Sequence, residues 1–167
     1  QSQGCLELRK KLRALQFKNI QASGKGINGL LGKVTSVPFM FGGKAEKDPE
    51  GSLVKAEVLI EKNPANVLGH EMIADAANLL GMTETVVFAY ETIRKIHPKN
   101  LKFLKDLGNA YLDAGKTEKA IETGNEILKL SPTDGDAVDL MKRASVAVAM
   151  NKGCLLYTSD AADEEDS

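Results

Sequence analysis

The 167-residue chain has no tryptophan, only two cysteines and no long apolar run. Cys5 and Cys154 stand far apart and in no paired motif, so we expect neither a disulfide framework nor a zinc site, and a reducing, cytoplasmic location. No apolar stretch is long enough to span a bilayer, and no signal peptide is visible. Because the first residue is Gln1 rather than methionine, we expect a fragment or a processed product.

Motifs for chemistry are also missing. The two histidines, His70 and His97, have no cysteine or acidic partner at metal-ligand spacing. No nucleophile, base and orienting residue form a recognisable set. The stretch 24–29, "GKGING", matches GxGxxG, but it follows a basic helical pattern instead of a strand, so we interpret it as a linker. We therefore predict no catalytic residue, metal ligand or cofactor, and a protein that is not an enzyme.

Charge is distributed unevenly along the chain. Residues 1–48 hold nine Lys/Arg and three Asp/Glu, a net charge of +6. Residues 49–152 have a net charge of −2, and residues 153–167 carry five acids and no base. The nearly neutral total of −1 thus conceals a basic front and an acidic tail.

The strongest pattern is a spacing of 34 residues between Pro64, Pro98 and Pro132, each of which ends an apolar, helical run. A fixed period of this length is typical of a helix–turn–helix repeat. Within 101–134, apolar residues recur at helical spacing in two runs. Gly115 separates the runs and is predicted to adopt a left-handed conformation, and Thr117 is predicted to cap the second helix.

This unit resembles the tetratricopeptide repeat (TPR), of a bacterial type. The matching positions are Leu104, the pair Leu107-Gly108, Tyr111, Ala120 and Pro132. Gly124 stands where the family usually has an aromatic residue, so we expect looser packing there. The unit 67–100 fits the same frame, with His70 in the large apolar position, where we expect a packing or groove-edge role. The resemblance implies an all-α fold, a helix-turn-helix array that forms a right-handed superhelix, or α-solenoid.

The predicted organisation follows from this register. Small residues such as Gly108 allow close approach of helices, and a single helix pair cannot bury its apolar face alone. We divide the chain into a basic amphipathic helix at 1–22, a Gly-rich and apolar insertion loop at 23–48, the second helix of a split repeat at 49–66, repeats at 67–100 and 101–134, the first helix of a truncated repeat at 135–152, and a disordered tail at 153–167. Val138, Met141, Ala144 and Ser145 are the predicted inward face of 135–152.

The front helix allows two interpretations. Cys5, Leu8, Leu12 and Leu15 share one face, and basic residues surround it. The helix is either the first helix of the split repeat, which we favour, or a helix that binds nucleic acid or an anionic membrane. The apolar part of the insertion either packs on the repeats or docks a partner. The stretch 154–164, "CLLYTSDAADE", resembles translated sequencing-adaptor sequence, so we expect the tail to be non-native.

The resemblance also implies a function. First helices of TPR arrays line a concave groove that holds a peptide or helix of a partner protein. The groove positions that we predict to bind the partner are Glu71, Met72, Asp75, Asn78, Lys102, Lys105, Asn109, Leu112 and Arg143. Lys105 and Asn109 match the start of the family's carboxylate clamp, whereas Leu140 replaces the next asparagine. We therefore predict a non-catalytic protein-interaction scaffold; the alternatives are an adaptor to nucleic acid or an anionic membrane, and the substrate-presenting part of a larger enzyme.

Overall fold

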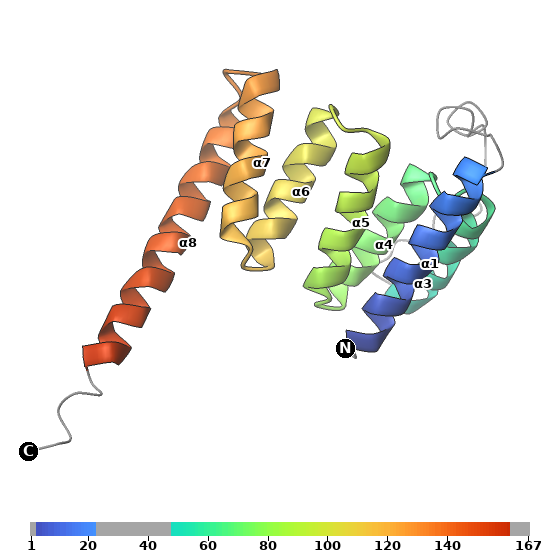
Figure 1. The fold of residues 1–167 in the computed structure, drawn as a ribbon, viewed down its shortest axis with the longest axis horizontal. Helices are drawn as coiled ribbons and strands as arrows, with labels where there is room; N and C mark the ends of the chain where they lie inside the picture. Colours follow the sequence, from blue (N-terminus) through green and yellow to red (C-terminus); the bar gives the residue numbers. More distant parts are fainter. Residues whose placement is uncertain (1–2, 23–47, 161–167) are drawn as a thin grey trace, which may run out of the picture. The chain divides into compact units, whose positions relative to one another are not determined.

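The described part of the chain is entirely helical, which confirms the predicted fold class. The computed structural model describes residues 3–22 and 48–160, with side chains over 5–22 and 48–150. Within these residues it contains seven helices: α1 (Gln3–Ala22), α3 (Pro49–Lys62), α4 (Val67–Leu79), α5 (Thr83–Ile96), α6 (Leu101–Asp113), α7 (Thr117–Leu130) and α8 (Gly135–Asp160) (Figure 1). The insertion loop at 23–47 and residues 161–167 lie outside the described residues.

The chain forms two compact units, Gln1–Phe103 and Leu104–Ser167, which we describe separately. In the first unit, α3 packs on α4 and α4 on α5; in the second, α7 packs on α8. The boundary between the units lies inside α6, after its first three residues.

The turn within each repeat has the same backbone in both units. Gly81 and Gly115 adopt φ values of 67° and 71°, which confirms the left-handed conformation predicted for Gly115 and shows the same conformation at Gly81. In each turn the backbone N–H of the residue after the glycine donates a hydrogen bond to the preceding helix. These bonds run from Met82 N to Ala77 O and from Lys116 N to Tyr111 O, both at 2.8 Å. The predicted Thr117 cap is wrong: Lys116 is the N-cap and makes no side-chain bond, because this backbone turn already sets the start of α7.

The turn after each proline is also repeated, and it explains the small polar residue that follows. Asn66, Asn100 and Asp134 lie 34 residues apart, and each side-chain oxygen accepts a backbone N–H of the next helix, from Gly69 at 2.8 Å, Phe103 at 3.3 Å and Ala137 at 3.1 Å. Such caps satisfy donors that the first helical turn leaves unpaired. The proline ends one helix, and the residue two places later starts the next.

Close helix packing in the second unit occurs at two buried glycines. A Cβ atom at Gly108 would lie 2.4 Å from Leu140 Cδ2, and one at Gly124 would lie 2.5 Å from Met141 Cγ. The predicted loose packing at Gly124 is therefore wrong. The flexible side chain of Met141, on α8, fills the space that an aromatic residue usually occupies in the family.

His70 lies in the interior of the first unit, where its side chain is 1% exposed. We assign Nε2 as the protonated nitrogen, which donates to the Pro64 carbonyl oxygen at 2.9 Å in the turn before α4. Burial, together with the nearby Arg13 charge, lowers the pKa of His70 to about 4, so the imidazole is neutral near pH 7. Of the two predicted roles, the structure shows packing.

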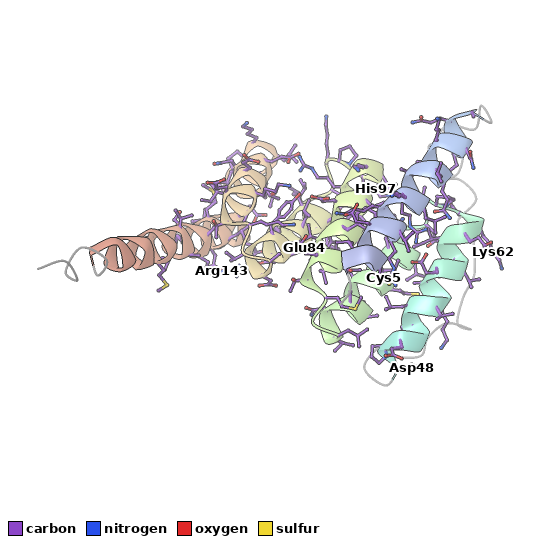
Figure 2. All side chains as sticks on the ribbon, turned by 60° about the horizontal axis from the view of Figure 1, so that its bottom comes forward. Cys5, Asp48, Lys62, Glu84, His97 and Arg143 are labelled. Carbon is purple, nitrogen blue, oxygen red and sulfur yellow. The ribbon has the colours of Figure 1, made fainter. Side chains whose placement is uncertain are left out.

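The packing of α1 differs from the prediction in two respects, its place in the repeat and the face that it buries. In both views α1, α3 and α5 run in the same direction (Figure 1 and Figure 2), whereas the two helices of one repeat run antiparallel. α1 contacts α5, and its Arg9 and Arg13 pair with Glu57 on α3. It is therefore not placed as the first helix of a split repeat, since it lies against two second helices.

The face of α1 that packs is also not the one that its apolar pattern indicates. Leu8, Leu12 and Leu15 are 68%, 45% and 59% exposed, while Arg13 is 3% exposed. The guanidinium of Arg13 donates to Gln16 Oε1 at 2.7 Å and pairs with Glu57. A long-range ion pair from α3 thus determines which side of α1 faces the unit.

α8 is longer than predicted, and its inward face agrees with the prediction at Ala144 and Met141 but not at Val138 and Ser145. It continues to Asp160, so the predicted disordered tail is wrong for residues 153–160, because extending an existing helix is far easier than starting one. Ala137, Leu140 and Ala144 are buried, whereas Val138 and Ser145 are exposed. Among the described helices, none has the length and apolarity needed to cross a membrane.

Candidate partner-binding faces

In the first unit, one face of α4 presents four of the predicted site residues. Glu71, Met72, Asp75 and Asn78 share this face by helical spacing; the first two are half-buried and the last two exposed. Two leucines extend it, Leu68 at 49% and Leu79 at 51% exposure. We call the set Leu68, Glu71, Met72, Asp75, Asn78 and Leu79 the α4 face.

Lys102, from the first turn of α6, lies at the edge of the α4 face. Its ammonium group pairs with Glu71 and lies 4.8 Å from the centre of the Phe103 ring. The pair joins side chains 31 residues apart and holds Glu71 in place. The ammonium is exposed, so we assign the pair a positioning effect and little stability.

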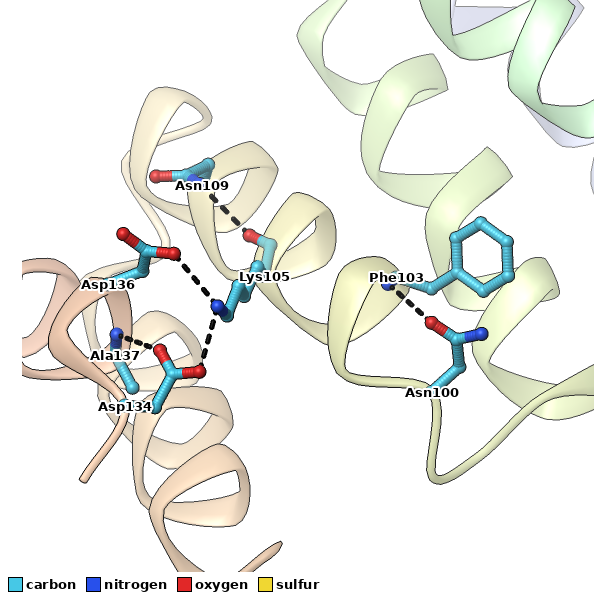
Figure 3. A network of polar contacts seen from close by, with 7 residues as sticks. All are labelled: Asn100, Phe103, Lys105, Asn109, Asp134, Asp136 and Ala137. Atoms are coloured by element: carbon cyan, nitrogen blue, oxygen red, sulfur yellow. Dashed lines mark hydrogen bonds and ion pairs between the residues drawn. The ribbon is translucent and has the colours of Figure 1, made fainter. Parts of the chain in front are cut away.

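In the second unit, the predicted residues of α6 and α8 form a polar network. Lys105 Nζ lies 2.8 Å from Asp134 Oδ2 and 2.8 Å from Asp136 Oδ2 (Figure 3). Arg143 donates from Nη2 to Asn109 Oδ1 at 2.7 Å and from Nε to Asp139 Oδ2 at 2.8 Å. We call Lys105, Asn109, Asp134, Asp136, Asp139 and Arg143 the α6–α8 network.

The charged groups of this network shift one another's pKa values. The hydrogen bonds from Lys105 to Asp134 and Asp136 raise the pKa of the Lys105 ammonium. The same contact with Lys105 lowers the pKa of the Asp134 carboxyl, and the Ala137 N–H that caps α8 lowers it further. The cation that would meet a partner's carboxylate therefore already lies between two carboxylates of its own chain.

A carboxylate clamp is not assembled here. Asn109 donates to the Lys105 backbone oxygen at 3.0 Å and accepts from Arg143, so its amide is used on both sides. Leu140 is 2% exposed and packs over Gly108, so it is not a groove position. Leu112 is half-buried, and its carbonyl accepts the Gly115 N–H of the turn at 3.0 Å.

No group of three or more His, Cys, Asp or Glu side chains within the described residues could hold a metal ion. What these faces offer is polar and apolar contact area for another molecule. The predicted site residues do not include three members of the network, Asp136, Asp139 and Asp134. Of these, Asp134 is the one with a recognisable sequence signal. Its position two residues after Pro132, matching Asn66 and Asn100, is the signal that could have identified it as a cap beside Lys105.

The arrangement of helices matches that of a TPR domain. A solved structure described as the first TPR of Spaghetti (RPAP3) bound to the HSP90 peptide SRMEEVD matches with a TM-score of 0.54 and 17% sequence identity, over 62% of this chain and 82% of that one. At this identity the match shows the fold. That fold is commonly a protein-binding module and is typically non-catalytic.

A curated protein also matches part of the sequence. The Protein CTR9 homolog of Arabidopsis thaliana is 38% identical over 58 residues, which are 35% of this chain and 5% of the plant protein. The matched relative is a plant protein, so it gives no support to a bacterial type. No protein-family model matches the chain.

Proposed function

We propose that this chain is a non-catalytic interaction module that binds a peptide or helix of a partner protein through the α4 face. The observation that carries the proposal is an apolar line on the first helix of a repeat in a TPR fold, made by the exposed Leu68 and Leu79 with the half-buried Met72 between them. Apolar side chains at this spacing fit the anchors of an amphipathic partner helix. The carboxylates of Glu71 and Asp75 beside them favour a partner that also carries basic residues.

The α4 face is a better primary site than the α6–α8 network. Burying its leucines against a partner removes apolar area from water, which is the main source of association energy. In the network, by contrast, a partner must first replace contacts that Lys105 and Arg143 already make within the chain. Lys105, Asn109, Leu112 and Arg143 remain proposed rim contacts for a longer partner.

Selection of a random peptide library on the chain, followed by affinity measurement, tests this function. The double variant Asp75→Lys with Asn78→Ala should weaken a selected peptide by roughly tenfold or more, since central interface residues dominate binding energy. Its matched control is Glu122→Lys with Asn125→Ala, which makes the same charge reversal and the same loss of an amide at the same spacing on the exposed side of α7. If both variants lose the same affinity for the peptide, or if neither variant loses any, the α4 face is not the binding surface.

A second candidate function has a specific observation of its own. The exposed leucines of α1 lie beside Lys11 and Lys18, neither of which makes a hydrogen bond or ion pair to any described residue. Leucines flanked by lysines suit the interface of an anionic membrane, whereas nucleic acid gains nothing from the leucines. The adaptor role is therefore proposed for anionic lipid ahead of nucleic acid.

Co-sedimentation with vesicles tests the adaptor role. Vesicles with phosphatidylserine should retain the chain, purely zwitterionic vesicles should retain it less, and Leu12→Gln should reduce retention. Val54→Gln is the control, because Val54 is 65% exposed on α3, outside α1. Salt-sensitive binding to duplex DNA that survives Leu12→Gln would instead favour nucleic acid.

A further inference from the structure

A cavity of about 350 Å³ lies between α1 and α5 in the first unit. Its size falls within the range of small-molecule sites. The two helices contact each other beside it, while Arg9 and Arg13 of α1 pair with Glu57 on α3. It is separate from the α4 face and is not used by the proposed function.

Its walls are mainly apolar. Phe17 on α1 and Phe88 on α5 both line it, together with Ala14, and the two rings are half-buried. Thr92 also lines it, but its hydroxyl donates to the Phe88 carbonyl oxygen at 2.8 Å within α5. That hydroxyl is satisfied within its own helix, so the wall favours an apolar group.

The charges that line the cavity are all positive. Lys10, Arg13 and Lys95 contribute cations, and no described lining residue carries a carboxylate. Two of the three are engaged, Arg13 with Glu57 and Lys10 with Glu7 at 2.9 Å. Lys95 is exposed and makes no hydrogen bond or ion pair to any described residue, so its ammonium can take an anion.

We propose that this cavity binds a small amphipathic carboxylate, whose apolar part lies between Phe17 and Phe88 and whose carboxylate meets Lys95. The apolar walls supply most of the affinity, and Lys95 at the rim selects the charge of the ligand. A cationic ligand of the same shape would be repelled by Lys95, and a neutral one would gain nothing from it.

Three ligands with the same eight-carbon chain test the proposal on the full chain: octanoate, octanol and octylammonium. Titration followed by amide NMR or calorimetry should give the tightest binding for octanoate and the weakest for octylammonium. Lys95→Gln should weaken octanoate roughly tenfold and leave octanol unchanged, since only the carboxylate loses its charge-assisted contact. Phe88→Leu should weaken both.

Lys129→Gln provides the matched control, because Lys129 holds the same position in the next repeat, 34 residues later and also exposed in the last turn of its helix. It should leave octanoate binding unchanged. Equal affinities for octanoate and octanol, equal effects of the two lysine variants, or no octanoate binding by a folded chain would each overturn the proposal. Circular dichroism verifies that every variant is folded.

Discussion

The buried His70 predicts a defined loss of stability in mild acid. Burial lowers its pKa from 6.5 to about 4 in the folded chain. Between these two values the unfolded chain binds a proton that the folded chain does not, so acid favours unfolding. The neutral side chain thus contributes stability that is fully present above pH 6.5 and declines as the pH falls toward 4.

The size of the effect follows from the two pKa values. This group alone should remove about 2 kcal/mol from the free energy of unfolding between pH 7 and pH 5, and about 3 kcal/mol by pH 4. Urea unfolding followed by circular dichroism, at a series of pH values, measures the slope. In His70→Gln the titrating group is gone, so the difference between variant and wild type should shrink by these amounts as the pH falls.

A direct titration complements the slope. The NMR signal of the His70 imidazole, assigned as the one absent in His70→Gln, should change with a midpoint near pH 4. A midpoint above 6, or a variant whose stability falls with pH as steeply as that of the wild type, would refute the buried, neutral histidine.

Three further predictions concern packing and caps. Gly108→Ala should destabilise the second unit by about 1 to 2 kcal/mol, because the added methyl group meets Leu140. In a Leu140→Ala background the same change should be neutral or stabilising, since the methyl group then fills vacated space. A double-mutant cycle in urea measures the coupling, and additive effects would contradict the contact. Arg13→Ala should release α1 and raise amide exchange in α1 while the turn at Gly81 stays protected; unchanged exchange would show that the pair with Glu57 does not hold α1. Asn66→Ala should cost about 1 kcal/mol through its lost cap, measured by the unfolding midpoint, whereas no change would remove the cap's assigned role.

Several features of the fold could be predicted because they depend on local chemistry. A proline that follows an apolar run stops its helix, and a glycine directly after the first helix of a repeat readily adopts the left-handed turn, so the helix ends near Pro98 and Gly115 were predictable from spacing alone. The caps at Asn66, Asn100 and Asp134 are equally local, and they could have been found from the same period.

Other features depend on partners far away in the sequence. The leucine line of α1 predicted the wrong buried face, because Arg13 finds Glu57, a partner 44 residues later. At Gly124, the family pattern gave no indication that Met141 would fill the space. For the site, helical spacing placed the α4 residues on one face, but it could not show that Lys105 is held between Asp134 and Asp136.

The measurement that tests the central proposal most directly uses the methionine methyl groups as probes. Met72 lies on the α4 face, while Met82 is the N-cap of α5 in the same unit and Met141 covers Gly124 in the second unit. A chain labelled at its methionine methyls, titrated with a selected peptide, should shift the Met72 signal first and most. A saturating titration that moves Met82 or Met141 and leaves Met72 in place would contradict binding at the α4 face.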